Sequence, residues 1–291
     1  MHRFLLHNGA ILDAAGAKVL TPGQVGLLNG WGVFSTVRVH GGVLFAFDRH
    51  WARMARDAAL LRVAFPWTAA ALEAELRKLI EANGARNATL RVCAVRNKGG
   101  LYEGPGQQRE TDLIAFTTDL RDWGGSVRLD IVPQGRHAAS RFAGAKVLSW
   151  AQNLVYYEQA HLAGFDEVVL LNERGEVSEC TSANIFAVLD GAAVTPPLSG
   201  GCLPGVTREL LLEEIRVPGI ETREQTLHPA DLERASEVFI TSTTRDLLPV
   251  AHIEGLTLRP GGGQVRNALQ SAFTAYVEDQ VAKAGGAFHA E

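Results

Sequence analysis

The order of apolar and polar residues predicts strands and helices in irregular succession through the first 120 residues. Period-two alternation and short apolar runs that end at glycine or asparagine are typical of strands. They occur at residues 4–6, 10–13, 30–40, 43–47, 88–96 and 112–117. His50, Arg53 and Asp57 recur on one helical face and predict a helix from Asp48, as its N-cap, to about Arg62. A second helix is expected over residues 69–81, with Thr68 as its N-cap.

The same patterns continue through the remainder of the chain. Strands are predicted at residues 127–132, 167–171, 184–189, 221–226, 238–241 and 250–253, and helices at 147–163, 206–215 and 264–284. Because there is no regular strand–helix–strand alternation, the expected fold class is mixed α+β. The polar segment 118–125 ends in Gly124-Gly125 and is expected to be a linker. It would separate an N-terminal α/β domain, residues 1–120, from a C-terminal domain, residues 121–291.

Composition narrows the class of protein. The chain has 291 residues, 46% of them hydrophobic and 21% charged, and a net charge of −4, as in an ordinary globular protein. It has no basic stripe of the kind that binds nucleic acid. No run reaches the roughly 18 apolar residues of a membrane span, and the first residues lack the apolar run of a secretion signal. We therefore expect a cytoplasmic protein without nucleic-acid or membrane partners.

Common motifs for metal and nucleotide binding are missing from the sequence. The nine histidines lack ligand spacing, and the three cysteines form no C-x-x-C pair, so no metal site is expected. Neither G-x-G-x-x-G, a P-loop, H-E-x-x-H nor G-x-S-x-G occurs.

Lys146 differs in its surroundings from the other four lysines. It lies between Phe142-Ala-Gly-Ala145 and Val147-Leu148, whereas the others have polar or helix-surface neighbours. Partial desolvation, together with the nearby charge of Arg141, would lower the pKa of this lysine and favour its reaction with a carbonyl group. The alternative is a surface lysine whose stem covers apolar neighbours.

Glu179 leads into the apolar strand that contains Ile185 and Phe186. A carboxylate next to a buried strand needs a cationic or hydrogen-bonding partner. The protonated nitrogen of a pyridoxal ring is one such partner. The alternative is a solvated turn residue after Ser178.

Two segments are candidates for binding a phosphate. Gly205-Val206-Thr207 places free N–H groups and a hydroxyl at a predicted helix N-terminus. The run Thr241-Ser242-Thr243-Thr244-Arg245 offers further hydroxyls, although it also fits an ordinary loop. Arg53 lies three residues after His50 on one helix face, where its guanidinium would suit a phosphate or form a surface pair. Arg91 and Arg96 flank residues 92–95, and Arg96 would suit a substrate carboxylate.

The order and spacing of these residues resemble the signature of class IV aminotransferases. The match consists of Glu179-x-Thr181-x-x-Asn184-Ile-Phe, Thr195 and Leu203-x-Gly205-Val-x-Arg208. It extends to Gly32-Val-Phe34-Ser-Thr-Val-Arg38, His50-x-x-Arg53 and Lys146, and covers nearly the whole chain. The resemblance implies a pyridoxal 5′-phosphate enzyme of fold type IV. Such enzymes have a smaller α/β N-terminal domain and a larger, barrel-like C-terminal domain, and they are typically homodimers.

The resemblance also implies roles for individual residues. Lys146 would join the cofactor covalently and move a proton between the substrate and the cofactor. Glu179 would pair with the pyridine nitrogen, and Asn184 would order Glu179. The phosphate would be held by Arg53, Val206, Thr207, Ser242 and Thr243. The substrate region would lie mostly between Phe34 and Tyr102, with Phe34, Arg38, Arg91 and Arg96 as its candidate residues.

The resemblance does not single out one subfamily. It implies an aminotransferase that moves an amino group between an amino donor and a keto acid by a ping-pong mechanism. Residues 34–39 and 96–100 resemble aminodeoxychorismate lyases, which eliminate pyruvate to give 4-aminobenzoate, but Leu101 stands where those lyases tend to carry arginine. Ser242-Thr243-Thr244 together with Arg96 resembles D-amino-acid aminotransferases. Ala151 stands where branched-chain aminotransferases usually have tyrosine. An (R)-selective amine transaminase and a non-catalytic relative are further alternatives.

Overall fold

The computed structural model describes residues 1–101, 103–259 and 261–288, so Tyr102 lies outside the described residues. The chain divides into two compact units. The first comprises residues 1–121, 146–150 and 279–291, and the second comprises residues 122–145 and 151–278. The segment Lys146–Trp150 therefore belongs to the first unit although the chain around it belongs to the second. The domain limits expected from the sequence, 1–120 and 121–291, remain a prediction.

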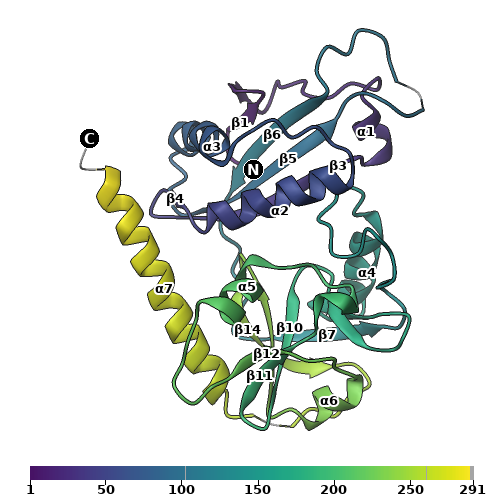
Figure 1. Ribbon diagram of the computed structural model, residues 1–291, viewed down its shortest axis with the longest axis vertical. Coiled ribbons are helices and arrows are strands. Elements are labelled where there is room, and N and C mark those ends of the chain that lie inside the picture. Colours follow the sequence, from purple (N-terminus) through teal and green to yellow (C-terminus); the bar gives the residue numbers. More distant parts are fainter. Residues whose placement is uncertain (102, 260, 289–291) are drawn as a thin grey trace. The chain divides into compact units, whose positions relative to one another are not determined.

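The first unit is built on one antiparallel sheet with the strand order β2-β1-β6-β5-β3-β4. The strands are β1 (Phe4–His7), β2 (Ala10–Asp13), β3 (Gly32–His40), β4 (Val43–Leu44), β5 (Ala88–Arg96) and β6 (Thr111–Thr118). Its helices are α1 (Val25–Asn29), α2 (Phe47–Leu60) and α3 (Ala69–Asn83). Helices α2 and α3 pack on the sheet (Figure 1), and their apolar side chains form one core with every second residue of β3 and β5.

The second unit contains an eight-stranded sheet that curls into a half-barrel, with the order β12-β11-β10-β13-β14-β7-β8-β9. The strands are β7 (Val127–Val132), β8 (Glu167–Leu171), β9 (Val177–Cys180), β10 (Asn184–Leu189), β11 (Ala192–Thr195), β12 (Thr222–Glu224), β13 (Glu237–Ser242) and β14 (Asp246–Ile253). Its helices are α4 (Ala151–Leu162), α5 (Val206–Glu213) and α6 (Pro229–Arg234), with the 3-10 turn η1 (Leu198–Gly200). Helix α7 (Gln264–Phe288) begins in this unit. Two sheets with interspersed helices confirm the mixed α+β class.

Three predictions of local structure are wrong. The strand expected over residues 43–47 ends at Leu44, because α2 already begins at Phe47. Its N-cap is Ala46, in the left-handed region with φ 50°, and Asp48 lies inside the first turn, where a carboxylate favours the helix dipole. The helix expected from residue 147 begins only at Ala151.

The segment that precedes α4 runs beside β3. Val147 forms an antiparallel bridge with Val33, and the N–H of Leu148 donates to the carbonyl of Gly32 over 2.9 Å. A side chain at Gly32 would clash with the carbonyl oxygen of Ala94 and with Leu148. Glycine at position 32 therefore allows residues 147–148 to pair with β3 at the edge of the sheet. This pairing places Lys146 next to the same edge.

Candidate cofactor and substrate residues

Lys146 is held through both of its backbone groups. Its N–H donates to Oδ2 of Asp57 in α2 over 2.9 Å, and its carbonyl accepts the N–H of Phe34 in β3 over 3.2 Å. The Nζ atom lies 4.7 Å from the centre of the Phe34 ring, a distance that allows a cation–π contact. Trp150 packs edge-on against the same ring, at 6.3 Å between centroids. The amine of Lys146 thus lies against the Phe34 ring, which in turn contacts Trp150.

Helix α2 presents His50 and Arg53 to β3, and both side chains are buried. The Nη2 of Arg53 donates to Oγ of Ser35 over 3.0 Å, and this hydroxyl is hydrogen-bonded to Nδ1 of His50 over 2.9 Å. Burial, with the positive charges of Arg53 and Lys146, holds the pKa of His50 well below its usual value of 6.5. If the Ser35 hydroxyl donates to Nδ1, the neutral ring carries its proton on Nε2. That buried atom has no hydrogen-bond partner among the described residues.

Three of the four candidate substrate residues share one face of the first sheet. Phe34, Thr36 and Arg38 lie on the same face of β3, because residues two apart on a strand point to the same side. Arg91 on the neighbouring strand β5 pairs with Thr36 and therefore lies on this face too. The guanidinium of Arg91 stacks on the Phe34 ring at 3.8 Å. This face is opposite to the one that packs on α2 and α3, since Val33, Val37 and Val92 belong to that core.

Arg96 does not join this group. Its position on β5 directs it to the opposite face from Arg91, and its guanidinium has other contacts. Nε donates to the carbonyl of Lys98 over 2.6 Å, Nη1 donates to the carbonyl of Arg62 over 2.9 Å, and the group stacks on Trp31 at 4.0 Å. Arg96 thus connects two loops of the first unit.

In the second unit, Glu179 is a buried carboxylate within β9 rather than a turn residue. Its Oε1 accepts Nε of Arg136 over 2.9 Å, and its Oε2 accepts the backbone N–H of Leu203 over 3.0 Å. Arg136 also donates to Oδ1 of Asn153 in α4, whose amide in turn donates to the carbonyl of Thr181. Each carboxylate oxygen keeps a second lone pair, so Glu179 can accept one more hydrogen bond.

Asn184 acts on Glu179 through the chain at Leu203 rather than by direct contact. Its Nδ2 donates to the carbonyl of Leu203 over 2.8 Å, and the N–H of the same residue donates to Glu179. A Cβ at Gly205 would clash with Oδ1 of Asn184, so the chain approaches closely only because glycine stands there. Gly205 is the N-cap of α5 and makes no side-chain cap, so the first N–H groups of the helix, including those of Val206 and Thr207, receive no acceptor from the N-cap residue.

Ser242 and Thr243 lie where β13 ends and the chain turns into β14. Register pairing places Asn184 opposite Thr241, and α5 packs against β13, so this turn lies near the start of α5. The Oγ1 of Thr241 is buried and has no hydrogen-bond partner among the described residues. The second unit thus brings together the candidate residues Glu179, Asn184, Val206, Thr207, Ser242 and Thr243.

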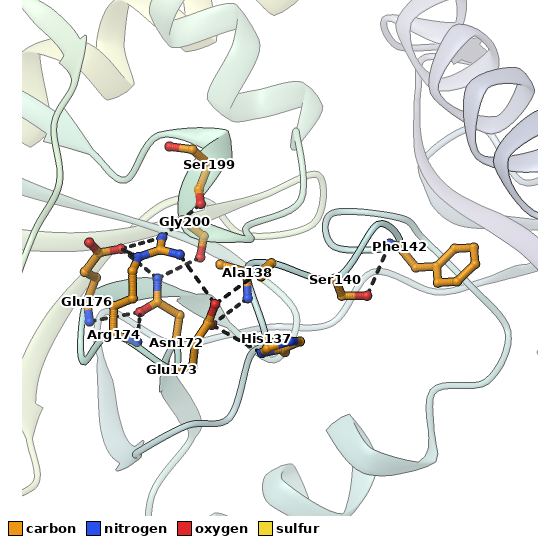
Figure 2. A network of polar contacts seen from close by, with 11 residues as sticks. His137, Ala138, Ser140, Phe142, Asn172, Glu173, Arg174, Glu176, Ser199 and Gly200 are labelled. Atoms are coloured by element: carbon orange, nitrogen blue, oxygen red, sulfur yellow. Dashed lines mark hydrogen bonds and ion pairs between the residues drawn. The ribbon is translucent and has the colours of Figure 1, made fainter.

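A polar network holds the loop that carries Arg136 (Figure 2). The carboxylate of Glu173 accepts the N–H groups of Ala138 and Ala139, over 2.7 and 3.1 Å. The hydrogen bond from Ala138 contributes most to lowering the pKa of Glu173 below its ordinary value. Arg174 donates to Glu176 over 2.7 Å and to the carbonyl of Ser199 over 3.0 Å. The turn at residues 172–176 thereby fixes the loop next to Arg136.

Sequence reasoning missed Arg136 and Glu167. Glu167 is buried and accepts the Ser182 hydroxyl, the Thr181 N–H and hydroxyl, and Arg245 Nη2. Arg245 stacks on Trp123 at 3.7 Å. The only available signal was a charged residue at the start of the apolar run 167–171, which by itself points to no partner.

Comparisons with known proteins agree on one family. The family model described as Amino-transferase class IV matches residues 32–253. A D-alanine aminotransferase of Bacillus licheniformis is 27% identical over 298 residues, which covers 96% of this chain and 99% of the relative. The branched-chain-amino-acid aminotransferase of Escherichia coli is 28% identical over 289 residues, covering 93% and 91%. A solved structure of the branched-chain amino acid aminotransferase from Escherichia coli superposes with a TM-score of 0.85 at 26% identity, covering 95% of each chain.

Proposed function

This chain belongs to the class IV aminotransferase family, and we propose that it transfers an amino group between an amino acid and a 2-oxo acid by a ping-pong mechanism. Enzymes of this family depend on pyridoxal 5′-phosphate, so the cofactor expected from the sequence is confirmed at the level of the family. The finer assignments that follow, to individual residues and to the reaction type, are proposals.

The groups present in the two units fit this cofactor. The first unit offers a lysine amine, the guanidinium of Arg53 and the buried Nε2 of His50, which no described residue hydrogen-bonds. The second unit offers Glu179, which has acceptor capacity left, the uncapped start of α5 and the hydroxyls of the β13–β14 turn. A pyridine nitrogen, an aldehyde and a phosphate need this set of partners.

We assign the following roles to these residues. Lys146 is the residue to which the cofactor is attached, and Glu179 accepts the hydrogen bond of the pyridine N–H. Arg53, Thr207, Ser242, Thr243 and the N–H groups of Val206 and Thr207 bind the phosphate. Asn184 keeps Glu179 in place through Leu203, and Arg136 balances the charge of Glu179.

When bound, pyridoxal 5′-phosphate supplies an electron sink and a carrier for the amino group. The chain then has two tasks: to orient the substrate and to move one proton. We propose that Nζ of Lys146 takes the proton from the substrate Cα and later returns one as a general acid. Arg38 and Arg91 suit the substrate carboxylate, and Phe34 suits its apolar part, since these three share a sheet face.

The observation that carries this proposal is the environment of Lys146. Its backbone is bonded to α2 on one side and to β3 on the other, and its amine lies against Phe34. A lysine so fixed is suited to repeated proton transfer at one point.

Reductive trapping tests the assignment. Borohydride treatment of the cofactor-loaded protein, followed by peptide mapping, is expected to place the cofactor on Lys146 alone. Lys146→Ala is expected to lose the visible absorption band and more than about a thousandfold of kcat, as for other covalent catalysts. Label on another lysine, or a wild-type protein that takes up no cofactor, would overturn the assignment.

A product assay separates transamination from the lyase reaction. Transamination requires an added 2-oxo acid, whereas elimination from aminodeoxychorismate releases pyruvate and 4-aminobenzoate without one. We expect turnover to depend on the 2-oxo acid. Release of 4-aminobenzoate in its absence would replace the aminotransferase proposal with the lyase one.

Domain division, assembly and location remain proposals. We propose a division at about residues 118–125 into an N-terminal α/β domain and a C-terminal cofactor-binding domain, a homodimeric assembly and a cytoplasmic location. Across residues 1–101, 103–259 and 261–288, none of the helices combines the length and the apolar character that crossing a membrane requires.

A further inference from the structure

Asp57 is a buried acidic residue to which sequence reasoning gave no role. It lies in the last turn of α2 and is 1% exposed. Its two oxygens have different partners: Oδ2 accepts the N–H of Lys146 over 2.9 Å, while Oδ1 accepts Nε and Nη2 of Arg56 over 2.9 and 2.6 Å. One oxygen is therefore neutralised by an arginine, and the other binds the backbone of the proposed cofactor lysine.

The location of Asp57 lowers the stability of helix α2. An acidic side chain in the last turn of a helix opposes the helix dipole, and a buried carboxylate loses hydration. The half-exposed Arg56 offsets only part of this cost, because its side chain is 48% accessible to solvent. The hydrogen bond that Asp57 accepts from the Lys146 N–H is a further stabilising interaction at this position.

Asp57 lies on the same face of α2 as Arg53. Their spacing of four residues is one helical turn, and both are buried on this face. One rigid helix thus positions the guanidinium that we assign to the phosphate and, through Asp57, the backbone of Lys146. From the other side, Phe34 donates to the carbonyl of Lys146. The lysine lies in an irregular segment, so these two bonds replace the support of a helix or strand.

We propose that Asp57 is a positioning residue that fixes the backbone of Lys146 and so presents its Nζ at a constant place relative to Arg53. The proposal rests on the function proposed above for Lys146. The bond from a backbone N–H to a carboxylate is charge-assisted and therefore stronger than a bond to a neutral acceptor. Loss of the acceptor would let residues 146–150 move, and misplacement of a catalytic group by about 1 Å costs roughly a hundredfold in rate.

Hydrogen exchange of the Lys146 amide tests the contact without any cofactor. In Asp57→Ala, the protection of this amide is expected to fall about ten- to a hundredfold, whereas amides in the middle of α2 and β3 keep theirs. Asp57→Asn retains one acceptor oxygen and should restore part of the protection. Asp48→Asn is the matched control, because it makes the same change at an exposed position of the same helix. It should leave the Lys146 amide unchanged.

Reaction with the cofactor tests the consequence. The rate of borohydride-trappable attachment to Lys146 is expected to fall at least about tenfold in Asp57→Ala and less in Asp57→Asn, with kcat affected more than KM.

The positioning role would be overturned if both variants attached the cofactor at the wild-type rate and showed unchanged hydrogen exchange at the Lys146 amide. A uniform loss of protection throughout the first unit would also overturn it, since that result indicates a purely structural residue. If Asp57→Ala does not fold, Asp57→Asn carries the test alone. Absence of label on Lys146 in the wild type would instead reject the proposed function, while the exchange result would still decide the contact.

Discussion

Arg136 and Glu179 form the ion pair that bears most on the proposed cofactor residues. Their side chains are 19% and 9% exposed. Replacing Arg136 with leucine would leave a buried carboxylate with only the Leu203 N–H. We expect a loss of about 2–4 kcal/mol in the free energy of unfolding. Denaturant unfolding of the cofactor-free protein measures this loss.

Arg174→Leu is the control for this variant. The Arg174 side chain also pairs with glutamates but is 44% exposed, so its removal is expected to lower the free energy of unfolding much less than the removal of Arg136 does. Equal losses in the two variants would contradict the role given to burial around Glu179.

His50 gives stability a dependence on pH. Burial and the charges of Arg53 and Lys146 lower its folded-state pKa well below 6.5. Below pH 6.5 the unfolded chain binds a proton at this residue while the folded protein does not. The stability that His50 contributes is therefore complete above pH 6.5 and is lost as the pH falls toward the folded-state pKa, at up to about 1.4 kcal/mol per pH unit.

His50→Gln should flatten this part of the pH profile. Unfolding measured at intervals between pH 7 and pH 5 checks it, and His137→Gln is the control because the His137 side chain is 69% exposed. If the free energy of unfolding of His50→Gln depended on pH as steeply as that of the wild type, the lowered pKa of His50 would not be the cause of the pH dependence.

The local sequence indicated which residues could take part in chemistry, but it did not indicate which residues they contact. The single lysine in apolar surroundings and the carboxylate before an apolar strand were visible as local patterns. Arg136 was not, since 43 residues separate it from Glu179 and only the loop between β7 and α4 brings the two together. For Arg96, the position at a strand end suggested a role in substrate binding. The side of the sheet on which its side chain lies depends on the strand register, which the local sequence does not reveal.

At the scale of elements, the approach of Gly205 to Asn184 connects α5 to β10. A Cβ at residue 205 would clash with the amide oxygen of Asn184, whose Nδ2 holds Leu203. Gly205→Ala is therefore expected to displace the start of α5, to lower stability by about 1–3 kcal/mol and to weaken cofactor binding. Thermal unfolding and cofactor titration measure the two effects.

Gly125→Ala is the matched control in the same unit, because nothing lies within 4 Å of its added Cβ. It should change the stability by less than about 0.5 kcal/mol. Equal behaviour of the two alanine variants would show that the close approach to Asn184 is unimportant.

Prediction of elements succeeded for uninterrupted apolar or alternating strands and failed for the shortest helices. Strands β5, β7, β8 and β10 have the predicted limits, since each is a continuous apolar or alternating run. Helices α1 and α6 span only five and six residues and were not predicted. The residues at 147–150 suit a helix locally, but pairing with β3 draws them into the first sheet.

At the scale of the whole molecule, each of the two compact units carries some of the residues that we propose bind the cofactor. Lys146, Arg53, Phe34 and Arg91 belong to the first unit, and Glu179, Asn184, Thr207 and Ser242 belong to the second. The family followed from the order and spacing of these residues, and the mixed α+β fold followed from the succession of predicted strands and helices. The substrate did not follow, because relatives of similar identity are named for D-alanine and for branched-chain amino acids.

Half-reaction spectroscopy tests the central claim most directly. The cofactor-loaded protein is mixed with single D- or L-amino acids without a 2-oxo acid. We expect at least one amino acid to convert the aldehyde absorbance to that of the amine form, with one 2-oxo acid released per active site. Addition of a 2-oxo acid should then restore the original spectrum. A spectrum that no amino acid of a broad panel changes, or a change that no 2-oxo acid reverses, would contradict the assignment as an aminotransferase.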